Sequence, residues 1–213
     1  MYDNTVTLLW FGGKKVKRVF DLIVSTFCLI LLSPVLLIIA ILIKADGNGS
    51  VIFKQYRVGK DDELFEIYKF RSMKEEAPEV ASNSLSNVDS YVTTVGKVLR
   101  KTSLDELPQL INIIKGQMSL VGPRPVIEDE SEEELLYLRK KYGINRLIPG
   151  LTGWAQVNGR DNMSIERKIE LEKEYLSKQS FFFDLKVLTI TALKVFKQDG
   201  ISEGSSKDFE DIV

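Results

Sequence analysis

An almost uninterrupted apolar run, Val19–Ile43, constrains the fold of this chain more than any other feature. Asp21 is the one charged residue within it, and four cations come just before it: Lys14, Lys15, Lys17 and Arg18. A helix of this length can reach across the hydrocarbon core of a bilayer. A secretory signal peptide is disfavoured because no small-residue cleavage site follows the run. We therefore expect a membrane-embedded helix after a poorly ordered lead-in over residues 1–13.

Ser33 and Pro34 stand in the middle of this run and change the expected path of the helix. A straight crossing would place residues 44–213 outside the cell, because the preceding cationic flank stays in the cytoplasm. The following flank is also basic, with Lys44, Lys54, Arg57 and Lys60. Proline kinks a helix, and a serine hydroxyl can satisfy the carbonyl that proline leaves free. We interpret the pair as the break in a re-entrant helix that enters and leaves by the cytoplasmic face; a kinked spanning helix is the alternative.

The composition limits the partners and the catalytic residue types that this chain can use. The 213 residues suffice for one domain plus an anchor, and the net charge of -1 gives no case for nucleic acid as a partner. One cysteine, Cys28, excludes a disulfide framework. The chain has no histidine, which excludes Ser-His-Asp triads, histidine-ligated zinc and histidine general bases. Catalysis must therefore use carboxylates, lysine, arginine, tyrosine or a hard cation bound by oxygen.

Two adjacent acids, Asp105 and Glu106, lie near the middle of the chain, shortly after Arg100 and Lys101. Ser103 and Glu106 have the spacing of a capping box, and helical apolar spacing follows from Leu107, so a well-capped helix is one interpretation. A catalytic pair is the other. Successive helical residues point about 100° apart, so both acids cannot serve one cap. One carboxylate could attack or bind a metal while the other orients the first.

Two glycine-containing motifs add cations. In Gly122-Pro123-Arg124-Pro125, an arginine fixed between two prolines suits bidentate binding of phosphate. The stretch Arg146–Arg160 contains three glycines, Trp154 and Asn158. The glycines allow close backbone approach, Trp154 offers a stacking face, and Asn158 with Arg160 offers polar recognition; a loop with a packed tryptophan is the alternative.

The remaining segments are read by local pattern. Residues 51–60 and 64–73 alternate like two strands of a hairpin that carries Lys54, Arg57, Lys69 and Arg71. Residues 74–90 are expected to form a mobile loop, and the acidic run 128–134 a solvated helix start. Residues 164–178 indicate a charged amphipathic helix. The apolar segment 181–196 suits a helix in the membrane interface, with core packing as the alternative.

Several of these motifs together resemble the bacterial sugar transferases, in their short monotopic form, the polyprenyl-phosphate phosphoglycosyl transferases. The resemblance rests on Thr102–Gln109, Gly122–Pro125, Gln55–Gly59, Tyr68–Met73, Arg146–Arg160 and the Ser33-Pro34 break. It implies a mainly helical α+β fold with a re-entrant membrane helix, a small cytoplasmic domain with a short β-hairpin, and amphipathic interfacial helices. We expect an anchor over residues 1–45, a catalytic domain over 46–200 and a polar tail over 201–213.

The resemblance also implies an activity on the cytoplasmic face of the bacterial inner membrane. Such an enzyme moves a sugar 1-phosphate from a UDP-sugar to undecaprenyl phosphate, releases UMP, and begins the membrane stage of polysaccharide or glycoprotein glycan synthesis ahead of further glycosyltransferases. Asp105 would be the nucleophile, Glu106 would assist, and both would hold Mg²⁺ or Mn²⁺. The expected phosphate or substrate ligands are Arg100, Arg124, Arg160, Lys69 and Arg71.

Two other classes of function stay open on the sequence. A non-enzymatic membrane-attached scaffold would tolerate replacement of Asp105. A glycosyltransferase that passes only the sugar would release a nucleoside diphosphate. The sugar, the glycoconjugate and the oligomeric state are not decided by these motifs.

Overall fold

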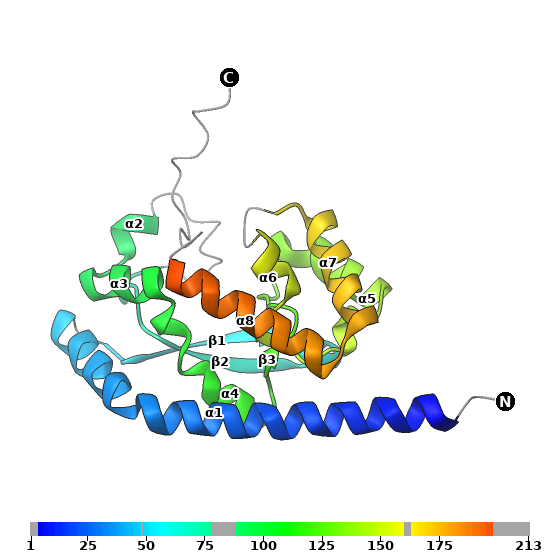
Figure 1. Cartoon of the computed structure of the whole chain (residues 1–213). Helices are drawn as coiled ribbons and strands as arrows, with labels where there is room; N and C mark the ends of the chain where they lie inside the picture. The colour runs from blue at the N-terminus through cyan, green and yellow to red at the C-terminus, as the bar shows by residue number, and fades with distance from the viewer. Residues whose placement is uncertain (1–3, 48, 78–87, 160–162, 198–213) are drawn as a thin grey trace.

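The longest element is the N-terminal helix α1 (Asn4–Asp46), which contains Pro34. The structure, a computed structural model, describes residues 4–47, 49–77, 88–159 and 163–197. The expected poorly ordered lead-in is wrong for residues 4–13, because the helix already includes them. The expected break at Ser33-Pro34 is a bend within a continuous helix (Figure 1). As predicted, the Ser33 hydroxyl donates to the Ile30 carbonyl at 2.8 Å, the acceptor that Pro34 leaves free.

The predicted hairpin is confirmed. Strands β1 (Ile52–Val58) and β2 (Leu64–Phe70) pair antiparallel, with Ile52 opposite Phe70 and Val58 opposite Leu64. The acidic turn between them is a short 3₁₀ segment, and its Asp61 and Asp62 adopt left-handed backbone conformations that aspartate tolerates better than most residues. The alternating pattern therefore predicted the two strands and the turn between them, and the structure gives their register.

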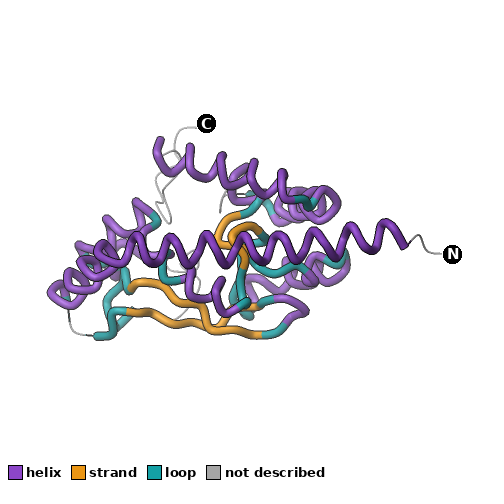
Figure 2. The backbone as a smooth tube through the Cα atoms, turned by 60° about the horizontal axis from the view of Figure 1, so that its bottom comes forward, coloured by secondary structure: helices purple, strands orange, loops and turns teal. Residues whose placement is uncertain are grey.

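Helices make up most of the remaining structure, in agreement with the expected α+β, mainly helical class (Figure 2). They are α2 (Val88–Tyr91), α3 (Thr94–Thr102), α4 (Gln109–Lys115), α5 (Glu133–Lys141), α6 (Trp154–Gly159), α7 (Ile165–Lys178) and α8 (Phe181–Lys197). Two short parallel strands, β3 (Ser119–Val121) and β4 (Gly150–Thr152), lie between them. Ser164 caps α7 by accepting from the Arg167 amide. Most of the expected loop 74–90 lies outside the described residues.

The predicted capping box is wrong. Ser103 ends helix α3 instead of beginning the next helix: its φ is 56°, and its amide donates to the Arg100 carbonyl. The acids follow in a single 3₁₀ turn, η3 (Leu104–Glu106), and α4 starts only after Pro108. The helical apolar spacing from Leu107 onward belongs to α4, and the acids are free of the capping role that the spacing suggested.

The main core joins the hairpin, α4, β3, α5 and α7. Its fully buried members include Ile113, Met118, Leu135, Ile144 and Val187. One side of α1 packs on this core through Phe20, Val24, Cys28 and Leu29. Figure 1 shows α1 running along one edge of the other elements, which explains why only part of its surface is covered.

Asp21, the one acid of the apolar run, has a structural explanation. Its side chain is buried and accepts hydrogen bonds from the Ser119 hydroxyl at 2.7 Å and the Leu120 amide at 3.3 Å. Lys17 donates to the Val121 carbonyl and forms an ion pair with Asp184 of α8. Strand β3 and helix α8 are thus both held against α1 by polar contacts that the sequence pattern did not reveal.

The rest of α1 exposes apolar side chains, such as Ile23, Phe27 and Ile30. Within the described residues, the segment Lys15–Asp46 is long and apolar enough to cross a membrane. Only 11% of its most apolar 18-residue window is buried in the structure, so this segment is not the core helix of the domain. An exposed apolar surface of this length favours association with a membrane.

Candidate active site

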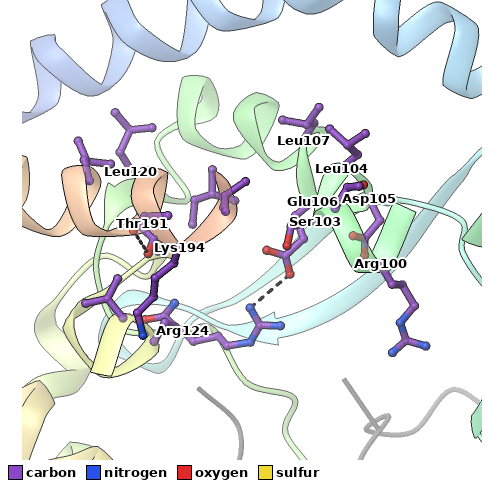
Figure 3. A pocket seen from close by; sticks show the side chains of 17 residues that line it. Arg100, Ser103, Leu104, Asp105, Glu106, Leu107, Leu120, Arg124, Thr191 and Lys194 are labelled. Atoms are coloured by element: carbon purple, nitrogen blue, oxygen red, sulfur yellow. Dashed lines mark hydrogen bonds and ion pairs between the residues drawn. The ribbon is translucent and has the colours of Figure 1, made fainter. Parts of the chain in front are cut away.

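A cavity of about 330 Å³ opens beside the acid pair (Figure 3). Its walls come from the end of α3, the η3 turn, strands β3 and β4, and helices α6 and α8. The polar and charged side chains that line it are Arg100, Thr102, Ser103, Asp105, Glu106, Arg124, Thr152, Gln156, Thr191 and Lys194. Leucine and valine side chains form most of the remaining wall. Charged groups at one side and apolar surface elsewhere are typical of ligand sites.

Glu106 is fixed by two cations. Its Oε1 accepts from Lys69 Nζ at 2.8 Å and from Arg124 Nη1 at 3.3 Å, and its side chain is only 16% exposed. Burial raises the pKa of this carboxyl, but the charges and hydrogen bonds of Lys69 and Arg124 outweigh burial and lower the pKa to about 2. Glu106 is therefore ionised at neutral pH and cannot rotate without losing both contacts.

Asp105 lies on the same 3₁₀ turn and is buried at the cavity wall. Neighbouring residues of a 3₁₀ turn point about 120° apart, so the two carboxylates reach the cavity from different directions (Figure 3). The ion pairs to Lys69 and Arg124 involve Glu106. The arrangement favours different tasks for the two acids, because they line the same cavity from different directions and Glu106 is held by Lys69 and Arg124.

Asn112 holds the hairpin against α4, and this places Lys69 within reach of Glu106. The Asn112 side chain is fully buried; its Oδ1 accepts from the Tyr68 amide at 3.0 Å, and its Nδ2 donates to the Glu66 carbonyl at 2.7 Å. These hydrogen bonds pair the backbone groups on the free edge of β2 immediately before Lys69. The predicted contribution of the hairpin to the site is therefore present for Lys69, and Asn112 is a positioning residue that the motifs did not identify.

Arg124 is held at its backbone. Its carbonyl accepts from Arg139 Nη1 at 3.0 Å, and Arg139 also forms a two-pronged, buried ion pair with Glu172 of α7. The predicted solvated helix after the acidic run is α5, with Glu133 and Glu134 in its first turn, but Arg139 on that helix is buried. A single buried cation in a charged helix has no periodic signal, so the sequence could not reveal it.

The two glycine motifs pack directly on each other. A Cβ added to Gly122 would collide with the Ile148 carbonyl, and one added to Gly150 would collide with the Gly122 amide. Parallel pairing of β3 with β4 brings these backbones together, since Val121 lies opposite Thr152. The glycines thus permit the close approach that places Arg124 beside the 150–157 segment.

The structure brings together some of the predicted ligands and separates others. Arg100 and Arg124 line the cavity, and Lys69 contacts Glu106 beside it. Arg71 does not line the cavity; its Nη1 lies 3.9 Å from Glu75 Oε1. Arg160 lies outside the described residues. Arg57, from the hairpin, lies near Arg124, and burial together with that neighbour lowers its pKa to about 10, so it stays protonated at neutral pH.

The tryptophan of the second motif serves packing. Trp154 donates through Nε1 to Glu174 at 2.8 Å, and its ring packs edge-on against Phe183, with centroids 5.0 Å apart. Gln156, two residues later, lines the cavity instead, and both polar atoms of its carboxamide are buried without a hydrogen-bond partner among the described residues. A buried amide without partners favours a hydrogen-bonding ligand, and Gln156 was missed because its role depends on the fold.

A divalent cation fits this site only together with a ligand. Across the described residues there is no group of three or more Asp, Glu, Cys or His side chains that could hold a metal ion. Mg²⁺ is often bound by one or two carboxylates plus substrate phosphates. Lys69 and Arg124 both contact Oε1 of Glu106. The oxygen atoms that would hold a divalent cation are Oε2 of Glu106 and the carboxylate of Asp105. The donor set suits Mg²⁺ or Mn²⁺ arriving with a phosphate-containing substrate.

Comparison with known proteins gives consistent matches over most of the chain. A family model described as bacterial sugar transferase matches residues 13–198. The chain is 41% identical to the uncharacterized sugar transferase EpsL of Bacillus subtilis, over 88% of this chain and 90% of that protein. It is 40% identical to the exopolysaccharide production protein ExoY of Rhizobium meliloti, over 83% of each chain.

A longer relative carries a more specific name. The UDP-glucose:undecaprenyl-phosphate glucose-1-phosphate transferase of Escherichia coli is 42% identical over 206 residues. That match covers 92% of this chain but 43% of the relative, so the chain spans less than half the length of that protein.

Proposed function

Because the chain belongs to the bacterial sugar transferase family, we propose that it transfers a sugar 1-phosphate from a UDP-sugar to a polyprenyl phosphate such as undecaprenyl phosphate. The observation that carries the proposal is the acid pair at the cavity wall, with Glu106 held by Lys69 and Arg124 and Asp105 beside it. Relatives named for transfer of glucose or galactose phosphate to undecaprenyl phosphate support the reaction class.

The reaction exchanges one phosphorus–oxygen bond for another in each of two steps. A carboxylate oxygen of Asp105 attacks the sugar-proximal phosphorus, the bond to the bridging oxygen breaks, and UMP leaves with the electron pair. An oxygen of the polyprenyl phosphate then attacks the same phosphorus and releases the Asp105 carboxylate. The product is a polyprenyl diphosphate sugar. Each step needs an anionic nucleophile, and the absence of histidine is compatible with this chemistry.

The cations of the cavity stabilise the charge of the transferred phosphoryl group. Arg124 lines the cavity and contacts Glu106, and its planar guanidinium suits contact with a phosphate oxygen as well. Arg100 lines the same cavity. Fixed positive charge in a cavity with apolar walls stabilises a transition state more strongly than the same charge in water. A divalent cation bound with the diphosphate would supply further charge neutralisation there.

Two further parts of the proposal concern the donor and the membrane. The Gln156 carboxamide, which has no hydrogen-bond partner among the described residues, offers a donor nitrogen and an acceptor oxygen side by side, which suits the imide edge of uracil or an amide on the sugar. The exposed apolar surface of α1 supports attachment to a membrane. The proposed anchor is re-entrant and keeps the site at the cytoplasmic face, where lipid acceptor and soluble donor meet. The lipid product would pass to further glycosyltransferases.

Product analysis tests the proposal. Detergent-solubilised protein is incubated with Mg²⁺, polyprenyl phosphate and a panel of UDP-sugars, and the released nucleotide is identified for the wild type and for Asp105→Asn. We expect UMP release that needs the lipid and falls at least about 10³-fold in Asp105→Asn, because the nucleophile is lost. Release of UDP would assign simple glycosyl transfer instead. Unchanged turnover in Asp105→Asn would refute the assignment of the nucleophile.

A further inference from the structure

Lys194 is a cation of the cavity that the acid pair does not use. It lies on α8, is half-buried, and lines the cavity together with Leu188, Thr191 and Val195 of the same helix. Among the described residues it has neither an ion pair nor a hydrogen bond. Lys186, about two turns earlier on α8, differs: its ammonium lies 4.9 Å from the centre of the Trp154 ring, and it does not line the cavity. A partly buried ammonium without a partner favours an anionic ligand.

The position of Lys194 separates it from the acid pair. Figure 3 shows Lys194 and Thr191 projecting from α8 on one side of the cavity and Asp105 and Glu106 on the other, with Arg124 reaching between them. The Thr191 hydroxyl donates to the Val187 carbonyl and is also bonded to Thr152 at 2.8 Å, so it is already engaged. Lys194 is therefore the group on the α8 side that can neutralise a negative charge.

The surroundings of Lys194 are apolar on both faces of α8. Inside the cavity, the nearby wall is formed by residues such as Leu188, Leu120 and Leu151. On the outer face of the helix, Phe182 and Leu193 are 80% and 56% exposed. Exposed aromatic and aliphatic side chains on a helix with interspersed lysines are typical of a membrane-interface helix.

Helix α8 is also attached directly to the membrane helix. The rings of Phe20 on α1 and Phe181 on α8 pack edge-on with centroids 5.1 Å apart, and Lys17 pairs with Asp184. The N-terminal end of α8 is thus joined to α1, and the same helix carries Lys194 at the cavity wall, whereas the hairpin carries Lys69 and Arg57. A lipid head group that reaches the cavity along α8 would meet Lys194.

We propose that Lys194 binds the phosphate of the polyprenyl acceptor and holds it, next to apolar surface, across the cavity from Asp105. This inference rests on the proposed function and deepens it by assigning separate cations to the two substrates. Arg124 and Lys69 serve the acid pair and the donor, and Lys194 serves the acceptor. A lysine suits this task because its flexible stem carries a compact charge to a mobile lipid head group.

The test compares lipids that differ only in the phosphate. Binding of a short polyprenyl phosphate and of the corresponding polyprenol is measured on the full-length protein in detergent, for the wild type, Lys194→Met, Lys194→Arg and the matched control Lys186→Met. We expect Lys194→Met to bind polyprenyl phosphate about 10- to 100-fold more weakly, the usual cost of losing a hydrogen bond to a charged group. Its binding of polyprenol stays unchanged, Lys194→Arg recovers most of the affinity, and Lys186→Met behaves as the wild type.

Steady-state kinetics complete the test. We expect Lys194→Met to raise the KM for polyprenyl phosphate while the KM for the UDP-sugar keeps its wild-type value. Equal binding of polyprenyl phosphate by Lys194→Met and Lys186→Met would overturn the assignment, as would a raised KM for the donor alone. If the wild type itself binds polyprenol as tightly as polyprenyl phosphate, the proposed function fails, and this inference fails with it.

Discussion

Replacement of Lys69 by methionine tests whether the hairpin controls the charge of Glu106. Lys69 is the closer of the two cations on this carboxylate, at 2.8 Å against 3.3 Å for Arg124. Methionine keeps most of the length and apolar stem of lysine, so the perturbation is mainly the loss of one charge and one hydrogen bond. Burial of Glu106 persists in the variant and favours its protonated form.

The size of the effect follows from the pKa of Glu106. In the folded protein it is lowered from its ordinary 4.5 to about 2, which corresponds to about 3 kcal/mol of stability. A carboxyl with a lowered pKa contributes this stability above its ordinary pKa and loses it as the pH falls through the folded value. In Lys69→Met the burial penalty is opposed by Arg124 alone, so we expect the pKa of Glu106 to rise back toward or above its ordinary value.

The assay is the pH dependence of kcat/KM for the UDP-sugar between pH 4.5 and 8. In the wild type Glu106 stays ionised over this range and adds no acid limb. In Lys69→Met the raised pKa of Glu106 introduces an acid limb at the low end of this range, and kcat/KM at pH 7 falls about tenfold or more because a charge-assisted hydrogen bond is lost. The control Lys54→Met, which removes an exposed lysine on the same hairpin that pairs with Glu66 instead, keeps the wild-type profile.

Two outcomes would refute the reasoning. One is a Lys69→Met profile with the same shape at low pH as the wild-type profile. The other is the same upward movement in the double variant Lys69→Met/Glu106→Gln, because a glutamine cannot titrate. Either result would mean that another group, and not Glu106, responds to the loss of Lys69.

Two further predictions concern the support of the site and the path of α1. Arg139→Met leaves Glu172 buried without its partner and should lower the free energy of unfolding by about 3 to 5 kcal/mol, which is measured as a lower Tm in detergent. The double variant Arg139→Met/Glu172→Met should recover most of this stability. An unchanged Tm of the single variant would contradict the role of the pair. The path of α1 is tested with single cysteines that replace Asn4 or Gly47 in a Cys28→Ser background. If α1 is re-entrant, both cysteines react with an impermeant thiol reagent from the same side of sealed vesicles. Reaction from opposite sides would establish a spanning helix.

Segments with a strong local pattern were predicted well from the sequence. The apolar run gave the long helix, and the freed carbonyl at Ile30 is satisfied by Ser33 as expected. Alternating apolar and polar residues predicted the hairpin, and helical spacing of apolar residues predicted α7 and α8. The capping box failed for a local reason: Ser103 has the spacing of an N-cap, but its left-handed backbone ends the preceding helix instead.

The candidate site was predicted only in part. The motifs identified Asp105, Glu106 and Arg124, which line one cavity. They placed Arg71 with them, although it lies near Glu75 and outside the cavity wall. They did not identify Gln156, because a glutamine on a short helix has no pattern that distinguishes a ligand from a surface residue.

By itself, the sequence determined the elements of this protein and the residue types of its chemistry, since helix and strand preferences, turns and the absence of histidine are local or compositional properties. Only the tertiary structure decided which residues meet. The contacts of Lys69 with Glu106, Asp21 with Ser119, and Arg139 with Glu172 join residues 37, 98 and 33 positions apart. The position of Lys194 in the cavity wall depends likewise on how α8 packs against α1 and β3. Such contacts follow from the packing of whole elements, because a buried charge is stable only where the fold brings a partner to it.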